Sequence, residues 1–200
     1  MLTAMGDVMR EAYKRGWITT RDGNVSIRRD DKFYITPSAV RKNIIHPEGI
    51  VKYKIKEDGD LEGETGASPS IELDMHKLVQ LSDKKTKSVV HLHPTYTIAL
   101  IHKLSKDLTY GKMDLANICE HFPEIYRYTK VGSTVRFHQP GSQKLAECVK
   151  NNLTQDGKLY YNIVGMQGHG VTAVASNPWD AFEHIERLEH ISRIYLASGV

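Results

Sequence analysis

The amino-acid sequence predicts a mixed α/β fold. Apolar residues recur with helical spacing at both ends of the chain, whereas three segments between residues 24 and 55 alternate apolar and polar side chains as strands do. A third observation is the run Ser88-Val89-Val90, whose two valines are β-branched and which leads into two histidines and a proline. With 200 residues, 40% of them hydrophobic, the chain is long enough for one core, and we expect a single domain over residues 1–200.

Composition excludes several classes of function. The formal charge is only +3, and no basic block is interleaved with aromatic residues, so we expect no nucleic-acid partner. Cys119 and Cys148 are the only cysteines and lack the spacing of a metal site, which fits two ordinary thiols in a reducing compartment. No apolar run approaches the length of a membrane span or a signal core. We therefore expect a soluble, cytoplasmic protein.

The first part of the chain is predicted to contain one helix and three strands. Apolar residues three or four positions apart predict a helix over residues 2–13 that ends at Gly16. Residues 24–28 and 33–36 flank Asp30 and Asp31, which predicts a hairpin. Residues 51–55 are predicted to form a third strand with one polar face, and residues 61–68 a loop.

Two turns in this part carry short polar side chains. Asn24 follows Gly23 at the start of the first strand, and Ser38 follows Thr36 and Pro37 at the end of the hairpin. Such side chains, with free backbone N–H groups beside them, can form a cradle for an anion. The alternative is that they are ordinary turn residues that bind their own backbone.

Residues 70–81 are predicted to form a helix with Ser70 as its N-cap and Glu72 in its first turn. Glu72 has two interpretations. The helix dipole favours an acidic residue at this end of any helix. The same helix end is also an anion site, and the helix leads directly into the strand that carries the two histidines, which favours a chemical role.

His91 and His93 stand at the end of the β-branched strand, directly before Pro94. Side chains alternate along a strand, so the two imidazoles share one face and Leu92 lies on the other. Pro94 suits the first turn of a following helix, which places the pair where the strand stops. Two imidazoles at the open end of a strand can chelate a divalent metal.

The last part of the chain contains a third candidate histidine. Ser142 is predicted to cap a helix that runs to residue 153, and residues 159–164 are predicted to form a buried strand. His169 follows between Gly168 and Gly170, which let the backbone bend and leave the imidazole uncrowded. A final helix is predicted over residues 178–196. Four other histidines are assigned to surface or core positions: His102, His121, His184 and His190.

Five short motifs occur in a specific order along the chain. They are Gly23-Asn24-Val25-Ser26, Thr36-Pro37-Ser38, Pro69-Ser70-Ile71-Glu72, His91-Leu92-His93-Pro94 and Gly168-His169-Gly170. In this order they resemble the class II aldolase/adducin family, and the resemblance covers nearly the whole chain. It implies a three-layer α/β/α sandwich around a central, largely antiparallel sheet. It also implies a cyclic homotetramer with active sites between neighbouring subunits.

The resemblance further implies a metal centre. His91, His93 and His169 would bind one Zn²⁺ per subunit, or another divalent metal, and three imidazoles leave positions open for substrate oxygens. Glu72 matches the acid/base carboxylate of the family. Some aldolases of the family take a proton donor across the subunit interface from a tyrosine after the histidine pair, and Tyr110 is the nearest candidate.

In the phosphate-using members of the family, the positions of Asn24, Ser38 and Ser70 hold the substrate phosphate. This chain departs from the family's sugar-phosphate aldolases at two positions, where Ile71 replaces a second serine and Ala39 replaces a glycine. The loss of one hydroxyl removes a charge-assisted hydrogen bond worth roughly 1.5–3 kcal/mol. The phosphate would then be held differently, or the substrate would lack one.

The resemblance therefore predicts a metal-dependent aldehyde-lyase, an aldolase that cleaves or forms a small, phosphorylated ketose through a zinc-stabilised enediolate. The alternatives are a sugar-phosphate 4-epimerase or dehydratase on the same scaffold, or a non-catalytic, adducin-like assembly module. The three histidines together with Glu72 favour an enzyme, because a purely structural domain has no physical need to keep them together.

Overall fold

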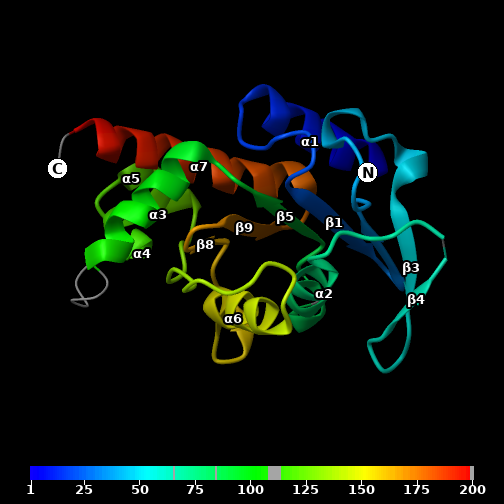
Figure 1. The fold of residues 1–200 in the computed structure, drawn as a ribbon. Coiled ribbons are helices and arrows are strands. Elements are labelled where there is room, and N and C mark those ends of the chain that lie inside the picture. Colours follow the sequence, from blue (N-terminus) through cyan, green and yellow to red (C-terminus); the bar gives the residue numbers. More distant parts are fainter. Residues whose placement is uncertain (65, 84, 108–113, 199–200) are drawn as a thin grey trace.

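A computed structural model describes residues 1–64, 66–83, 85–107 and 114–198 of the chain. Its centre is a seven-stranded sheet with the order β4-β3-β2-β1-β5-β9-β8, in which all neighbouring strands are antiparallel (Figure 1). The strands are β1 (Asn24–Arg29), β2 (Lys32–Ile35), β3 (Val51–Ile55), β4 (Leu61–Gly63), β5 (Ser88–Leu92), β8 (Ile163–Met166) and β9 (Gly170–Ala175). A separate small ladder joins β6 (Thr154–Gln155) to β7 (Lys158–Leu159).

Helices cover both faces of the sheet. On one face α7 contacts both α1 and α3, and on the opposite face α2 lies against α6 (Figure 1). The helices are α1 (Leu2–Lys14), α2 (Leu73–Ser82), α3 (Thr95–Asp107), α4 (Leu115–Cys119), α5 (Pro123–Tyr128), α6 (Gln143–Leu153) and α7 (Pro178–Ala197), with short 3₁₀ turns at Lys42–Ile44 and Pro47–Gly49. The three-layer α/β/α arrangement around an antiparallel sheet is thus confirmed.

Strand β5 divides its side chains between two hydrophobic cores. Val90 and Leu92 belong to the core shared with α1, α3 and α7, whereas Val89 belongs to the core under α2 and α6. Because strand side chains alternate, His91 lies on the same face as Val89. The strand therefore delivers His91 to the side of the sheet that α2 covers.

The start of α2 differs from the prediction. The helix begins at Leu73, Glu72 takes the N-cap position, and Ser70 is not the cap. The reason is a tie to the hairpin: the backbone N–H of Ser70 donates to the carbonyl of Thr36 at 3.1 Å, next to a bridge between Pro37 and Pro69. This tie keeps the chain extended beyond the position where the sequence pattern alone starts a helix.

Two loop and strand predictions were wrong. Residues 61–68 were expected to be a loop, but Leu61–Gly63 pairs with β3 as an edge strand after a tight turn at Gly59, which has a φ of +82°. Residues 159–164 were expected to be one strand, but the main sheet takes only Ile163–Met166. The backbone N–H groups of Tyr160 and Tyr161 both donate to the carbonyl of Leu153, which breaks the run.

The other long elements were predicted correctly, including the first helix, the hairpin, the histidine strand and the final helix. Ser142 caps α6 as expected, because its hydroxyl accepts a hydrogen bond from the backbone N–H of Leu145 at 3.2 Å. Within the described part of the chain, no helix combines the length and the apolar character that a membrane crossing requires.

Candidate metal centre and acid/base site

Three histidines from two segments meet on the α2 side of the sheet. His91 is the next-to-last residue of β5, His93 directly follows the strand, and His169 lies in the turn between β8 and β9. The Nε2 atoms of His91 and His93 are 2.9 Å apart, and one nitrogen from each of the three rings lies within 4.8 Å of the others. The structure thus brings together all three histidines singled out from the sequence.

Hydrogen bonding and burial prepare His91 to act as a ligand. Its Nδ1 lies 2.9 Å from the carbonyl oxygen of Val171, and because a carbonyl only accepts, Nδ1 carries the proton and Nε2 keeps a free lone pair. Burial is the main cause that lowers the pKa of His91 well below its ordinary value, and it lowers the pKa of His93 as well. Neutral imidazoles of this kind are the form that binds a divalent metal.

The two glycines beside His169 have different functions. Gly168 has a φ of +67°, the left-handed backbone that turns the chain between β8 and β9. Gly170 leaves space: a Cβ at this position would lie 2.4 Å from the carbonyl oxygen of Leu92 and 2.8 Å from Cδ2 of His93. A side chain at position 170 would therefore intrude between the histidine rings.

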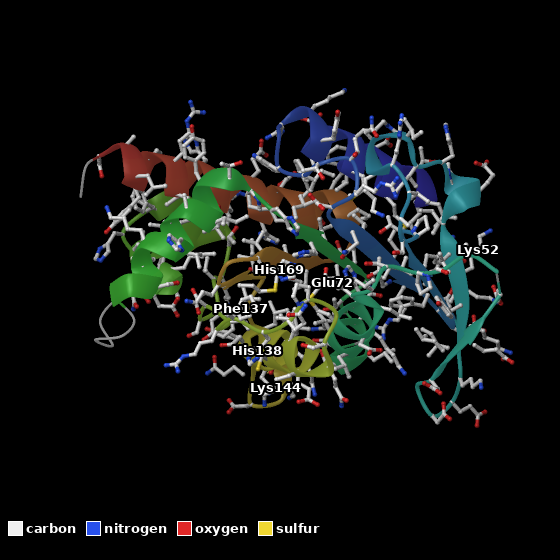
Figure 2. The ribbon with its side chains drawn as sticks, in the orientation of Figure 1. Lys52, Glu72, Phe137, His138, Lys144 and His169 are labelled. Carbon is white, nitrogen blue, oxygen red and sulfur yellow. The ribbon has the colours of Figure 1, made fainter. Side chains whose placement is uncertain are left out.

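Glu72 completes the cluster. Its Oε2 lies 3.3 Å from Nε2 of His91. Its Oε1 lies 3.3 Å from Nε2 of His169, and Glu72 and His169 are both labelled in Figure 2. The side chain is 4% exposed and makes no cap hydrogen bond to α2. Asn24 donates a hydrogen bond from Nδ2 to Oε2 at 3.0 Å, whereas Oε1 has no hydrogen-bond partner among the described residues. The carboxylate is thus directed at the histidines rather than at its own helix end.

The three residues predicted to bind an anion line the same cavity as the histidines and Glu72. This cavity has a volume of about 320 Å³ and includes Asn24, Ser38 and Ser70 in its wall. Ile71, which replaces a serine of the family pattern, is 67% exposed and lies at the rim. Most of the Ile71 residue is therefore exposed to solvent rather than buried in the cavity.

Two basic residues of the cavity were missed in the sequence. Lys42 is 3% exposed, its Nζ donates to the carbonyl of Pro37 at 2.5 Å, and no described carboxylate forms an ion pair with it. Burial is the main cause that lowers the pKa of Lys42 to about 8, and the neighbouring Arg21 lowers it further. The guanidinium of Arg21 donates to the carbonyl of Ala39 at 2.8 Å. Their only signal in the sequence is that each lies a few residues from one of the two polar turns.

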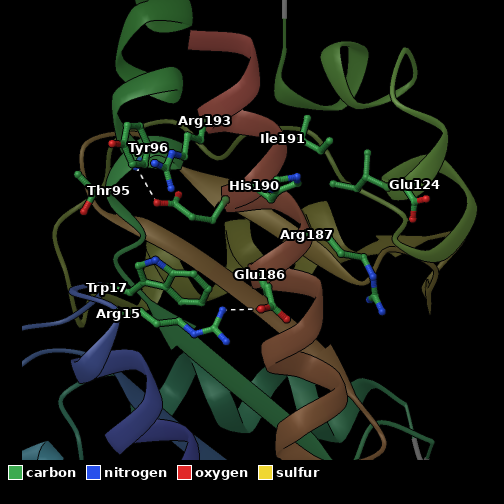
Figure 3. A pocket seen from close by; sticks show the side chains of 12 residues that line it. Arg15, Trp17, Thr95, Tyr96, Glu124, Glu186, Arg187, His190, Ile191 and Arg193 are labelled. Atoms are coloured by element: carbon green, nitrogen blue, oxygen red, sulfur yellow. Dashed lines mark hydrogen bonds and ion pairs between the residues drawn. The ribbon is translucent and has the colours of Figure 1, made fainter. Parts of the chain in front are cut away.

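A larger cavity, of about 840 Å³, lies between the end of α1, the start of α3 and α7 (Figure 3). Two of its acidic side chains have partners, because Glu186 pairs with Arg15 and Glu189 accepts a hydrogen bond from the backbone N–H of Tyr96 at 3.0 Å. Among the described residues, the only candidate metal cluster is that of the three histidines. The smaller cavity is therefore the candidate active site.

Two earlier assignments complete the account of candidate residues. Tyr110, the proposed proton donor, lies outside the described residues. Burial raises the pKa of the Cys119 thiol to about 12, so this thiol stays protonated at neutral pH and is a poor nucleophile.

Comparison with known proteins gives consistent matches over almost the whole chain. Residues 3–196 match the family model of the class II aldolase and adducin N-terminal domain. A 3-oxo-tetronate 4-phosphate decarboxylase from Haemophilus influenzae is 29% identical over 189 residues, which cover 93% of this chain and 82% of that protein. An L-fuculose phosphate aldolase from Methanocaldococcus jannaschii is 23% identical over 192 residues, which cover 94% and 92%.

Among solved structures, L-fuculose-1-phosphate aldolase from Thermus thermophilus superposes with a TM-score of 0.77 at 23% sequence identity. The superposition covers 98% of this chain and 92% of that one. At this identity the comparison shows that the two chains share a fold.

Proposed function

The chain belongs to the class II aldolase and adducin family, and we propose that it is a metal-dependent aldehyde-lyase that cleaves or forms a small ketose phosphate. The observation that carries the proposal is the position of Glu72, whose two carboxylate oxygens each lie 3.3 Å from a different histidine of the cluster. An acid/base group and a set of metal ligands in one cavity are the parts that such a reaction needs. We take residues 1–200 as one catalytic domain.

The residues present fit a divalent cation. His91, His93 and His169 would hold it, with zinc as our first choice because three neutral imidazoles leave its remaining position open. The buried Oε1 of Glu72, which has no hydrogen-bond partner among the described residues, fits a neighbouring positive charge. When bound, such an ion supplies a Lewis acid that polarises the substrate carbonyl.

Glu72 would carry the proton of the reaction. In the direction of carbon–carbon bond formation, its Oε1 would take a proton from the carbon next to the substrate carbonyl, and in the cleavage direction it would return the proton to that carbon. The hydrogen bond from Asn24 fixes the other oxygen, Oε2, and so sets the direction in which Oε1 points. Burial excludes water from this oxygen and favours transfer to the substrate.

An anionic group of the substrate would bind at the far end of the cavity, near Ser38 and Ser70. Lys42 supplies a positive charge there, and this charge offsets the hydroxyl lost at Ile71. Both relatives compared above carry "phosphate" in the names of the compounds they act on, which supports a phosphorylated substrate for this chain as well.

A decarboxylase is the second candidate. The relative from Haemophilus influenzae is named for the decarboxylation of a 3-oxo acid phosphate. Decarboxylation next to a carbonyl and retro-aldol cleavage both break a carbon–carbon bond and both need a proton delivered to the carbon that remains. Glu72 could deliver that proton in either reaction.

The proposal includes a homotetramer with active sites between subunits and Tyr110 as a proton donor. We expect gel filtration with light scattering to give four times the mass of 22.7 kDa. We also expect Tyr110→Phe to lower turnover while the tetramer persists. A fully active monomer would contradict this part of the proposal.

The test combines metal analysis with two product assays. Purified protein is expected to hold one divalent ion per chain and to release an aldehyde from a member of a panel of ketose phosphates, or carbon dioxide from a 3-oxo acid phosphate. Glu72→Gln should keep the fold and the ion but lose about 10²–10⁴-fold in kcat, the usual contribution of a positioned acid/base group. Glu57→Gln, an exposed position, is the matched control. Full activity of Glu72→Gln would overturn the assigned role.

A further inference from the structure

A chain of buried polar side chains runs from Glu72 into the layer between β1 and α2. Its members beyond Glu72 are Asn24, His76, Ser26 and Gln80, none of them more than 6% exposed. Four contacts join them in order, from Glu72 Oε2 to Asn24 Nδ2 at 3.0 Å, Asn24 Oδ1 to His76 Nε2 at 2.5 Å, His76 Nδ1 to Ser26 Oγ at 2.6 Å, and Ser26 Oγ to Gln80 Nε2 at 2.6 Å.

The donors and acceptors of this series follow from the chemistry of each group and from the burial of His76. The carboxylate of Glu72 only accepts, so the NH₂ group of Asn24 faces it and the amide oxygen faces His76. That oxygen also only accepts, so Nε2 of His76 carries a proton. Burial lowers the pKa of His76 to about 3, so the ring is neutral and has one N–H. Its Nδ1 therefore accepts from the hydroxyl of Ser26, which in turn accepts from Gln80.

All four hydrogen bonds thus point in the same direction, toward the carboxylate of Glu72. The opposite polarity would turn the amide oxygen of Asn24 against the carboxylate, and two acceptors would then face each other without a proton between them. Because all four hydrogen bonds run in one direction, they select a single orientation of the Asn24 side-chain amide, which could otherwise be flipped.

The periodicities of the two elements explain why these side chains meet. Asn24 and Ser26 are two residues apart on β1, a repeat of about 6.6 Å. Glu72, His76 and Gln80 are four residues apart along α2 and its N-cap, a repeat of about 6.0 Å on one helix face. The two repeats nearly match, so successive side chains of the helix and of the strand interleave.

From this geometry we propose that His76 is a positioning residue, which holds the NH₂ group of Asn24 on Oε2 of Glu72 and so leaves Oε1 as the oxygen that exchanges a proton with the substrate. The proposal rests on the function proposed for Glu72. His76 lies beyond Asn24 and acts on the carboxylate only through it. A purely structural role would consist of filling buried space and satisfying Ser26.

The first measurement is independent of activity. Nitrogen NMR of the metal-free protein is expected to show His76 as a neutral ring with the proton on Nε2 and none on Nδ1. A proton on Nδ1, or a doubly protonated ring at neutral pH, would overturn the proposal. This measurement needs no substrate. The proposed direction of the hydrogen bonds and the proposed function of the protein are therefore tested separately.

The second measurement uses the active enzyme. His76→Leu, which keeps the volume but removes the donor, is expected to lower kcat about 10–100-fold while KM and metal content change little, as for other outer partners of a functional group. His76→Gln is expected to recover part of kcat, because its amide N–H can take the place of Nε2–H. If His76 were only structural, His76→Leu would lower the stability and the fraction of active protein. The remaining folded protein would then keep its kcat, and His76→Gln would restore nothing.

Ser26→Ala provides a second test of the proposal in case the His76 variants do not fold. It removes the donor to Nδ1 and leaves Asn24 and Glu72 intact, so a smaller fall in kcat is expected. Ser88→Ala is the matched control, because Ser88 is also fully buried but its hydroxyl donates to the backbone carbonyl of Ser26 at 3.1 Å. That hydrogen bond is not one of the four that lead to Glu72. Wild-type kcat in folded Ser26→Ala, or an equal loss in Ser88→Ala, would refute the positioning role.

Discussion

Gly170 is the position at which a single added methyl group should disturb the arrangement of the three histidines. In Gly170→Ala the new Cβ would lie 2.4 Å from the carbonyl oxygen of Leu92 and 2.8 Å from Cδ2 of His93. Ordinary contact begins at 3.4 Å, so the backbone at Leu92 has to move by about 1 Å. Leu92 pairs with Val171 across β5 and β9, and the movement therefore opens the end of the ladder that carries the histidines.

The expected magnitudes follow from this displacement. Overpacking of a rigid site typically costs about 1–3 kcal/mol, so the metal-free variant should unfold at a lower denaturant concentration. Metal–ligand distances are held to within about 0.2 Å. Cδ2 of His93 would have to move by about 0.6 Å to reach ordinary contact, and such a shift is incompatible with them. We expect zinc affinity to fall about 10–100-fold, as it does when the partners of a ligand are disturbed.

Competition with a chromophoric chelator measures the affinity, and urea unfolding of the metal-free protein measures the stability. Gly49→Ala is the matched control, because a Cβ at this position meets nothing within 4 Å and Gly49 has no positive φ. Its zinc affinity should equal that of the wild type. Unchanged zinc affinity in Gly170→Ala would refute the assignment of the three histidines as the metal ligands.

Three further predictions concern the cavity and the buried histidines. Ala39 has a φ of +55°, which costs a residue with a side chain about 1–2 kcal/mol, so urea unfolding of Ala39→Gly should show a gain of about 0.5–1 kcal/mol after the entropy of glycine is subtracted. Lys42→Met should raise the KM for a phosphorylated substrate about ten- to a hundredfold. Because its pKa is lowered to about 8, Lys42 is charged below that pH, so the KM of the wild type should rise above pH 8 and that of Lys42→Arg should not. Burial also lowers the pKa of His76 to about 3 and of His184 to about 4, so between these values and pH 6.5 the unfolded chain binds more protons. In the metal-free protein, the contribution of these two histidines to the free energy of unfolding should be fully present above pH 6.5 and should fall below that pH by about 1.4 kcal/mol per pH unit for each histidine. His184→Asn should reduce this slope.

Local rules predicted part of the histidine cluster from the sequence. Strand alternation placed His91 and His93 on one face, and the glycines around His169 indicated a turn with room for a ring. The contact between the strand end and the turn required more, because it depends on the pairing of β5 with β9. The order of the family motifs supplied that long-range information.

The missed residues have in common that only tertiary contacts reveal their environment. Nothing in the sequence distinguishes Lys42 from an ordinary surface lysine. In the structure it is buried beside the Thr36–Ser38 turn, and burial lowers its pKa. His76 shares a helix face with Glu72 through its spacing of four, which is visible in the sequence. Its partners Asn24 and Ser26 come from a strand about fifty residues earlier, and no local pattern joins the two segments.

The error at the start of α2 and the position of Glu72 have the same cause. A helix that began after Ser70 would place Glu72 in its first turn, where the free N–H groups of the helix end attract a carboxylate. The hydrogen bond from Ser70 to Thr36 delays the helix to Leu73, and Glu72 keeps a backbone outside the helix, with φ −95° and ψ 20°. Its side chain makes no cap and reaches Asn24 and the histidines instead. The tertiary contact that prevents the helix from starting at Ser70 is therefore also the contact that leaves the Glu72 side chain free to face the histidines.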